Sequence, residues 1–410
     1  MMPSFDFVAL ARVRDAALSR APISLGVRRT ASPHEFYRYP ARFSPELAAA
    51  AIDAFSSPGD VVADYFVGGG TTLVEARRAS RLAIGSDINS LSAFVTSVKT
   101  RLYSASELDQ VIVWAKGVVD DERAPAEMPV DDVARSYFRN VMSAETVQHR
   151  GMVLNAITRL DEVDSPKARA LARCVLLRTA QWAFDMRRDI PSVDLVRQAL
   201  VDNASSMTTA AHASTKHYRV ADKRARASGL PRSLVLHRGL PGVSDHRSVS
   251  RYPAPRLVLT SPPYPGVYVN YHRWKVRGRH ETPFPYFLAG QEDGNGLAYY
   301  TMSARSDRSQ QTYFSKLQVA FIDIARMCDT NTHVVQVVGF NDVDDQLGRY
   351  LAAMKRAGFT EVKFDDLATA EDGRLWRDVP GRRWWAHAGD RANIAPHTAR
   401  EVVLVHRPAH

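Results

Sequence analysis

The stretch Thr260-Ser261-Pro262-Pro263-Tyr264 follows directly on the apolar run Arg256-Leu257-Val258-Leu259, which has the pattern of a buried strand. Neither proline can donate to a sheet ladder, so the chain must leave the sheet as a stiff rim. The Ser261 hydroxyl and the Pro262 carbonyl can accept hydrogen bonds, and Tyr264 offers a flat face for stacking. Such a rim suits a planar ring that carries an amino group. A proline pair that only ends a strand is the alternative.

A second motif lies upstream, where the apolar run 61–66 leads into Gly68-Gly69-Gly70 and Thr71-Thr72 open a helix. Glycines let the backbone approach a ligand closely, and a helix start presents free N–H groups to a carboxylate. The next apolar run, 82–87, ends in Asp87. That acid stands about twenty residues after the glycines, where sheets of this kind place an acceptor for a ribose diol.

These two motifs resemble those of the S-adenosylmethionine-dependent DNA amino methyltransferases, which modify cytosine N4 or adenine N6. The resemblance covers residues 34–100 and 233–410. It implies S-adenosyl-L-methionine as the cofactor and DNA with a flipped target base as the partner. The Ser-Pro-Pro-Tyr spelling is commoner among the cytosine-N4 enzymes of that family. We therefore expect site-specific cytosine-N4 methylation of DNA, with adenine-N6 methylation as the alternative.

The resemblance also implies which residues form the site. The catalytic residues would be Ser261, Pro262, Pro263 and Tyr264. The cofactor-binding residues would be Phe43, Asp64, Phe66, Gly68, Gly70, Thr71, Thr72, Asp87, Asn89 and Asp245. Two of these have simpler explanations, since Phe43 could be an aromatic plug against the sheet and Asp245 a turn residue. Gly69 departs from the family, which often has serine there.

Composition supports a nucleic-acid partner without proving one. The 410 residues include 54 Lys and Arg against 44 Asp and Glu, a formal charge of +10. This balance favours a polyanion, although it also serves solubility. No apolar run approaches the roughly 18 residues of a membrane span, so we expect a cytoplasmic protein without a membrane partner. The two cysteines, Cys174 and Cys328, are too few for a disulfide framework or a thiolate zinc site, and no metal is expected.

Residues 101–230 interrupt the alternation of strands and helices, with helices expected from Ser106, Ser143 and Ser165. We expect a helical insertion here, between a cofactor-binding half (1–100) and a catalytic half (231–410). Together they predict an α/β fold: a doubly wound, mainly parallel sheet of the Rossmann-like class I methyltransferase type. The insertion has no chemical motif, which favours packing or contact with a partner over catalysis.

Two basic stretches are candidate contacts to DNA. One is the end of the insertion, whose basic side chains could instead form a face exposed to solvent that binds no DNA. The other is an irregular loop after Tyr264 that mixes aromatics and cations, and it could instead pack on the insertion. The residues chosen are Lys223, Arg224, Arg226, Tyr271, Arg273, Lys275 and Arg277.

The rest of the chain predicts a helix capped by Ser44, a helix at 313–328, a strand at 333–339, a helix at 345–356 and a final strand at 401–406. Residues 1–33 and the segment around Trp376, Trp384 and Trp385 have no clear pattern.

Two other functions compete with DNA methylation. RNA or a protein side-chain amide could be the acceptor, since similar rims hold planar amides. A non-enzymatic DNA-binding subunit is the other alternative. The resemblance implies a place in restriction–modification or a related defence system, with a partner from that system.

Overall fold

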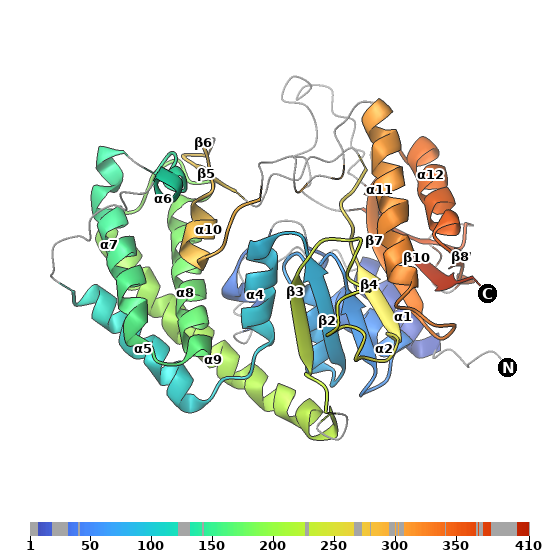
Figure 1. Ribbon diagram of the computed structural model, residues 1–410, viewed down its shortest axis with the longest axis horizontal. Helices are drawn as coiled ribbons and strands as arrows, with labels where there is room; N and C mark the ends of the chain where they lie inside the picture. The colour runs from blue at the N-terminus through green and yellow to red at the C-terminus, as the bar shows by residue number, and fades with distance from the viewer. Residues whose placement is uncertain are drawn as a thin grey trace.

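The structure is a computed structural model, shown in Figure 1. It describes residues 7–18, 32–39, 42–121, 132–141, 143–225, 229–265, 273–278, 280–294, 300, 302, 307–340, 342–365, 368, 372–378 and 400–409. An α/β sheet forms one side of the molecule, and a block of helices stands beside it (Figure 1).

The central sheet has the order β3-β2-β1-β4-β7-β10-β8, with β9 paired to β10. Its strands are β1 (Val61–Asp64), β2 (Leu82–Asp87), β3 (Ser233–His237), β4 (Leu257–Thr260), β7 (His333–Phe340), β8 (Phe359–Val362), β9 (Leu375–Asp378) and β10 (Arg400–Pro408). The first five in that spatial order are parallel, and β10 runs antiparallel to β7, β8 and β9. A mainly parallel, doubly wound sheet is therefore confirmed.

Helices cover both faces of the sheet, because alternate residues of each buried strand point to opposite sides. Val61 and Ala63 pack with α11 (Asp307–Ala325) and α12 (Val343–Arg356). Val62 packs on the other side with α1 (Phe7–Leu18), α2 (Pro45–Phe55) and α3 (Thr71–Arg78). Ser44 caps α2 as predicted, accepting from the Leu47 N–H.

A separate core holds the helical block together. The block contains α5 (Ala105–Val119), α6 (Asp132–Ser136), α7 (Val147–Thr158), α8 (Pro166–Phe184) and α9 (Val193–Ala225), with 3₁₀ turns at 144–146 and 159–162. The apolar face of α8 is buried along its length, and α4 (Ser90–Thr100) joins this core from the sheet side. A 3₁₀ turn, η1 (Pro33–Phe36), also packs there. This core therefore also includes residues outside 101–230.

The segment after the Ser-Pro-Pro-Tyr rim differs from the prediction of an irregular loop. Its described part forms a hairpin, β5 (Trp274–Val276) with β6 (His280–Thr282), followed by α10 (Phe284–Ala289). Trp274, Phe284 and Tyr286 are fully buried in the core of the helical block. Trp274, which the sequence offered as part of a stacking surface, is here a packing residue of the helical block, and Tyr268 and Tyr271 lie outside the described residues.

Other differences lie where the pattern was weak. Residues 7–18 form α1, where an irregular arm or a short helix was expected, and the 33-residue α9 had no predicted counterpart. The helix predicted at 313–328 spans 307–325 instead. Trp376 belongs to the edge strand β9, and Trp384 and Trp385 lie outside the described residues.

Candidate functional site

The two sequence motifs meet at the carboxyl edge of the sheet, the edge at which β1, β2, β3 and β4 end. Strands β1 and β4 are neighbours, so the glycine turn and the Ser-Pro-Pro-Tyr rim leave the sheet side by side. Two hydrogen bonds join them directly. The Thr260 hydroxyl donates to Asp64 Oδ1 at 2.6 Å, and the Thr72 hydroxyl donates to the Leu259 carbonyl at 3.1 Å. A ligand bound by one motif therefore lies beside the other.

Asp64 stands beneath this junction and does not line its surface. Its side chain is 2% exposed and also accepts from the Phe66 N–H at 3.1 Å. Burial raises the pKa of the Asp64 carboxyl to about 6, although these hydrogen bonds oppose the rise. Phe66, the next but one residue, is partly exposed at the edge. Asp64 thus fixes the geometry of both motifs from below.

The glycine turn is shaped by its neighbours. Gly70 has a φ of +78° at the start of α3, and a Cβ there would lie 2.7 Å from Thr96 Oγ1. A Cβ on Gly69 would lie 3.0 Å from Tyr39 Cβ, so a side chain there would require Tyr39 to shift slightly. Behind the turn, the buried Lys99 amine donates to the Gly69 carbonyl at 2.8 Å. Burial lowers the pKa of Lys99 to about 7.

Asp87 is the acid at the end of β2, and it keeps part of its surface exposed. Its Oδ2 accepts from the Gly68 N–H at 2.9 Å, and its Oδ1 accepts from the Asn89 N–H at 2.8 Å. Burial raises the pKa of the Asp87 carboxyl to about 6, against the effect of these two bonds. Each carboxylate oxygen can accept more than one hydrogen bond, so Asp87 retains acceptor capacity for a diol.

The rim residues are held in place from the sheet. The Ser261 hydroxyl donates to the Val337 carbonyl at 2.9 Å, which commits its proton and leaves its oxygen able to accept. The Tyr264 hydroxyl donates to Glu401 at 2.7 Å, and Glu401 is paired with Arg377. Both Ser261 and Tyr264 are partly exposed.

Two further residues fit the rim to the sheet. The Tyr264 ring lies so close to Gly339 that a Cβ there would be 2.7 Å from Tyr264 Cε2. The Tyr313 hydroxyl donates to the Pro263 carbonyl at 2.7 Å. The rim is therefore rigid before any ligand binds.

Two predicted cofactor residues, Phe43 and Asn89, occupy positions with other evident roles, and a third, Asp245, is exposed. Phe43 is buried among α2 and the sheet, the plug position considered above. Asn89 is buried, and its side chain accepts from the Ser92 N–H to cap α4. Asp245 is exposed in the segment that follows β3, and the neighbouring N–H groups of Gly242 and Val243 donate to Asp323.

A chain of hydrogen bonds leads from Asp87 away from the sheet. Asn89 Nδ2 donates to the Tyr286 hydroxyl at 2.8 Å, and the Tyr286 ring stacks on Tyr300 at 6.4 Å between centroids. The Tyr300 hydroxyl donates to Asp293 at 2.9 Å, and Asp293 pairs with Arg273. The hairpin that follows the rim is thereby linked to the cofactor side of the site.

The predicted contacts to DNA are spread over the molecule. Arg273 is 15% exposed and paired with Asp293 and Glu281, and Arg277 pairs with Glu145. Lys275 lies on β5 between them. Lys223 and Arg224 belong to the last turn of α9, and Arg226 and Tyr271 lie outside the described residues. The end of α9 lies below β3 in Figure 1, away from the edge that carries the rim.

Comparison with known proteins bears on this site. Residues 24–93 match the family model described as DNA methylase. A stretch of 102 residues is 28% identical to the type II methyltransferase M.MjaII of Methanocaldococcus jannaschii, covering 23% of this chain and 19% of that protein. The chain is therefore similar to the N6/N4 DNA methyltransferase family, with the family model matching residues 24–93. The family implies S-adenosylmethionine as the methyl donor. The chain matches about a fifth of the relative's length, 19%.

Two solved structures of the rRNA methyltransferase aviRa from Streptomyces viridochromogenes also align. One has 11% identity and a TM-score of 0.34 and covers 93% of this chain and 94% of that one; the other has 12% identity and a TM-score of 0.29, covering 79% and 84%. Scores this low carry no argument, and the fold assignment rests on the strand order.

The residues present at the carboxyl edge fit the cofactor of the N6/N4 family. The buried Thr71 hydroxyl, in the first turn of α3, has no hydrogen-bond partner among the described residues. No side chain caps α3 at Gly70, so the helix start keeps N–H groups for a carboxylate. Asp87 supplies a partly exposed acceptor at the end of the neighbouring strand.

Cysteine chemistry has no place at this edge. Cys174 is buried in α8, and Cys328 lies just after α11 and not inside it as predicted. Burial raises the pKa of both thiols to about 12. The described residues contain no group of three or more potential metal ligands, and none of their helices is long and apolar enough to cross a membrane.

Several residues of this edge were not found from the sequence: Tyr39, Lys99, Thr260, Tyr286, Tyr313, Gly339, Arg377 and Glu401. Glu401 had a usable signal, because an acid opening an otherwise apolar strand needs a buried partner. Lys99 had a similar signal, because it is a cation at the end of an apolar helix face. The others act through contacts between distant segments, which no local pattern encodes.

Proposed function

We propose that this protein transfers a methyl group from S-adenosylmethionine to the exocyclic amino group of a base in DNA, with cytosine N4 as the expected position. The observation that carries the proposal is the junction of the two motifs through the Thr260–Asp64 hydrogen bond of 2.6 Å. It sets a cofactor-type glycine turn and acid beside a rim built to accept from an amine.

Each residue then has a distinct task. Asp87 accepts from the ribose diol, and the start of α3 with Thr71 receives the carboxylate end of the cofactor. S-adenosylmethionine, when bound, supplies an electrophilic methyl group on sulfur. Ser261 and the Pro262 carbonyl accept from the target amine, which favours a nitrogen whose lone pair is directed away from the ring. Tyr264 stacks on the base, which must be flipped out of the duplex to reach this edge.

The preference for cytosine rests on the neutral Ser261 hydroxyl and the spelling of the rim, because an aspartate there would offer a charged acceptor. Adenine N6 is the alternative position. We further propose that residues 101–230 form an insertion between the cofactor-binding half (1–100) and the catalytic half (231–410), and that the protein works in restriction–modification or a related defence system in the cytoplasm.

Transfer of a labelled methyl group tests this function. Protein, labelled S-adenosylmethionine and either unmethylated DNA or RNA of the same sequence are incubated, and label in the nucleic acid is counted. We expect label in DNA, and on the order of 10- to 100-fold less with Tyr264→Ala. Label only in RNA would show that RNA, and not DNA, is the substrate. Cofactor binding without transfer to either nucleic acid would reject the proposal.

A further inference from the structure

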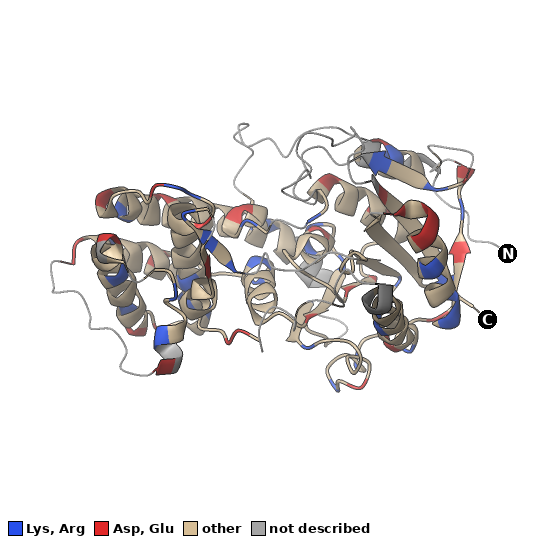
Figure 2. Cartoon of the chain, turned by 90° about the horizontal axis from the view of Figure 1, so that it is seen from above, with Lys and Arg blue, Asp and Glu red and all other residues tan. Residues whose placement is uncertain are grey.

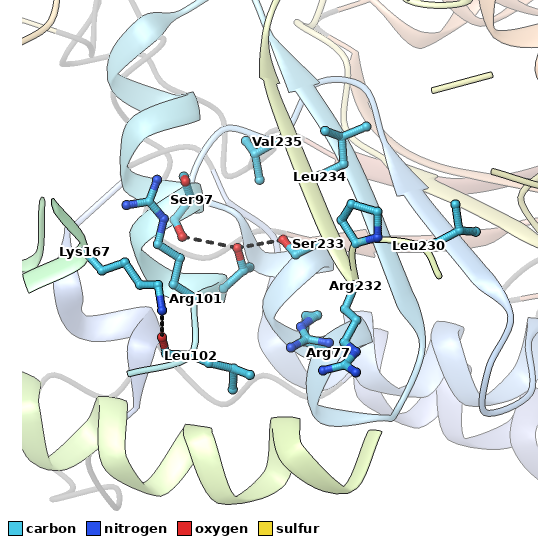
Figure 3. Close-up of a pocket in the computed structure, with 12 residues that line it drawn as sticks. Arg77, Ser97, Arg101, Leu102, Lys167, Leu230, Arg232, Ser233, Leu234 and Val235 are labelled. Atoms are coloured by element: carbon cyan, nitrogen blue, oxygen red, sulfur yellow. Dashed lines mark hydrogen bonds between the residues drawn. The ribbon is translucent and has the colours of Figure 1, made fainter. Parts of the chain in front are cut away.

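A second cavity lies at the amino edge of the sheet, where β3 begins. It has a volume of about 510 Å³ and is drawn in Figure 3. Ser233 opens β3 and pairs with Ala83, near the start of β2, whereas Asp87 ends β2 and pairs with His237. Four residues along a strand span about 13 Å, so this cavity is separate from the carboxyl edge.

Four cations from four different elements line this basic cavity. Arg77 comes from the last turn of α3, Arg101 follows α4, Lys167 comes from the first turn of α8, and Arg232 precedes β3 (Figure 3). No described residue that lines it is acidic. Because these positions are far apart in sequence, the fold itself brings the positive charges together, unlike a basic run on a solvated face.

The charged side chains that line the cavity are all basic, which suits a phosphate group. Glu107, which is not among the lining residues, pairs with Lys167 at 3.6 Å. The acidic and basic residues of the rest of the chain are mixed over both parts of the molecule (Figure 2).

The other residues of the cavity wall offer contacts for a ligand larger than a single ion. Arg77 is 2% exposed and lies over the Tyr218 ring at 4.8 Å, so its guanidinium is held in a fixed place. The Ser233 hydroxyl donates to Thr100 Oγ1 at 2.9 Å, and both residues line the cavity. Leu230, Pro231, Leu234 and Val235 provide an apolar side. The volume lies within the range of pockets for small organic ligands.

We propose that the basic cavity binds a phosphate-bearing nucleotide, with the phosphates between Arg101 and Arg232 and the base against the apolar side. The phosphates could belong to a free nucleotide or to a strand of DNA, and the two sources are distinguished below. The site is independent of methyl transfer, because it shares no residue with the carboxyl edge.

Calorimetry with thymidine triphosphate tests the proposal. This nucleotide has no exocyclic amine, and saturating S-adenosylhomocysteine keeps it out of the cofactor site. We expect binding that weakens with salt and falls at least about tenfold in Arg101→Ala/Arg232→Ala, a loss of about 1.4 kcal/mol. The matched control, Lys355→Ala/Arg356→Ala, removes the same charge from the exposed end of α12 and should bind as the parent protein does.

A competition experiment assigns the source. A single-stranded oligonucleotide that displaces the bound triphosphate would identify DNA as the natural ligand, and one that does not would identify a free nucleotide. The proposal is overturned if the folded parent protein binds neither, or if the Arg101/Arg232 variant and the α12 control bind equally well.

Discussion

The two edges of the sheet carry opposite chemistry although they share the same strands. At the carboxyl edge, Asp64 and Asp87 end β1 and β2, and burial raises the pKa of both carboxyls. At the amino edge, Arg232 precedes β3, and Arg77 and Arg101 come from the far ends of α3 and α4. In a sheet of parallel strands connected by antiparallel helices, strand ends and helix starts lie at one edge, and strand starts and helix ends lie at the other. Acids at strand ends and cations at helix ends are therefore separated to opposite edges.

The difference teaches where each ligand belongs. A sulfonium cofactor is a cation at its reacting atom, and it is favoured at the edge that carries the partly exposed Asp87 with the buried Asp64 beneath it. Phosphates are favoured at the other edge, among four cations. The basic end of α9 lies toward this second edge, so DNA that contacted Lys223 or Arg224 would extend well away from the rim (Figure 1).

The strongest test of the carboxyl edge is removal of its stacking face. Tyr264→Ala should lower methyl transfer on the order of 10- to 100-fold, because base–aromatic stacking contributes about 1–3 kcal/mol. Tyr264→Phe keeps the ring and loses only the hydrogen bond to Glu401, so it should retain most activity. Thymidine triphosphate binding at the amino edge should not change in either variant. Equal loss in both variants would argue against stacking.

Asp87→Asn should weaken binding of S-adenosylhomocysteine by about 1–3 kcal/mol through the lost ribose contact. The control is Asp109→Asn, an exposed acid on α5. In the parent protein the same affinity should fall as pH drops through about 6, since the charged carboxylate is the better acceptor and its pKa lies there. Calorimetry measures both. An unchanged affinity for Asp87→Asn would remove this acid from the ribose site.

The link between cofactor and hairpin predicts a smaller effect. Tyr286→Phe deletes the hydrogen bond from Asn89 and should weaken cofactor binding by about 0.5–1.5 kcal/mol, although the ring stays buried. It should also lower DNA affinity more in the presence of cofactor than without it. If DNA affinity responded to cofactor equally in Tyr286→Phe and the parent, the two sides would not be coupled through this contact.

Lys99 gives a signal of another kind, a change in the slope of stability with pH. Its pKa is about 7 in the folded protein and near 10.5 when unfolded, so the unfolded chain binds more protons between these values. The free energy of unfolding should therefore rise as pH increases through this window. Lys99→Met should flatten the rise, which thermal melts at several pH values would show. A parent protein without such a rise would mean that Lys99 stays charged.

Local patterns were enough for the fold class and for most of the sheet. Strand 82–87 and the caps at Ser44 and Ser165 follow from short-range rules, and the structure confirms all three. The hairpin at 274–282 was missed because burial of Trp274 depends on helices more than 80 residues away, among them α8. The basic cavity was missed for the same reason, since its four cations are adjacent only after folding.

The product of the reaction tests the central claim most directly. Unmethylated DNA is incubated with the protein and S-adenosylmethionine, digested to nucleosides and analysed by mass spectrometry. The junction of the glycine turn and the Ser-Pro-Pro-Tyr rim predicts N4-methylcytosine, which should fall on the order of 10- to 100-fold with Tyr264→Ala. N6-methyladenine would change the base and leave the mechanism intact. Protein that binds S-adenosylhomocysteine yet yields no base methylated on an exocyclic nitrogen would contradict the account.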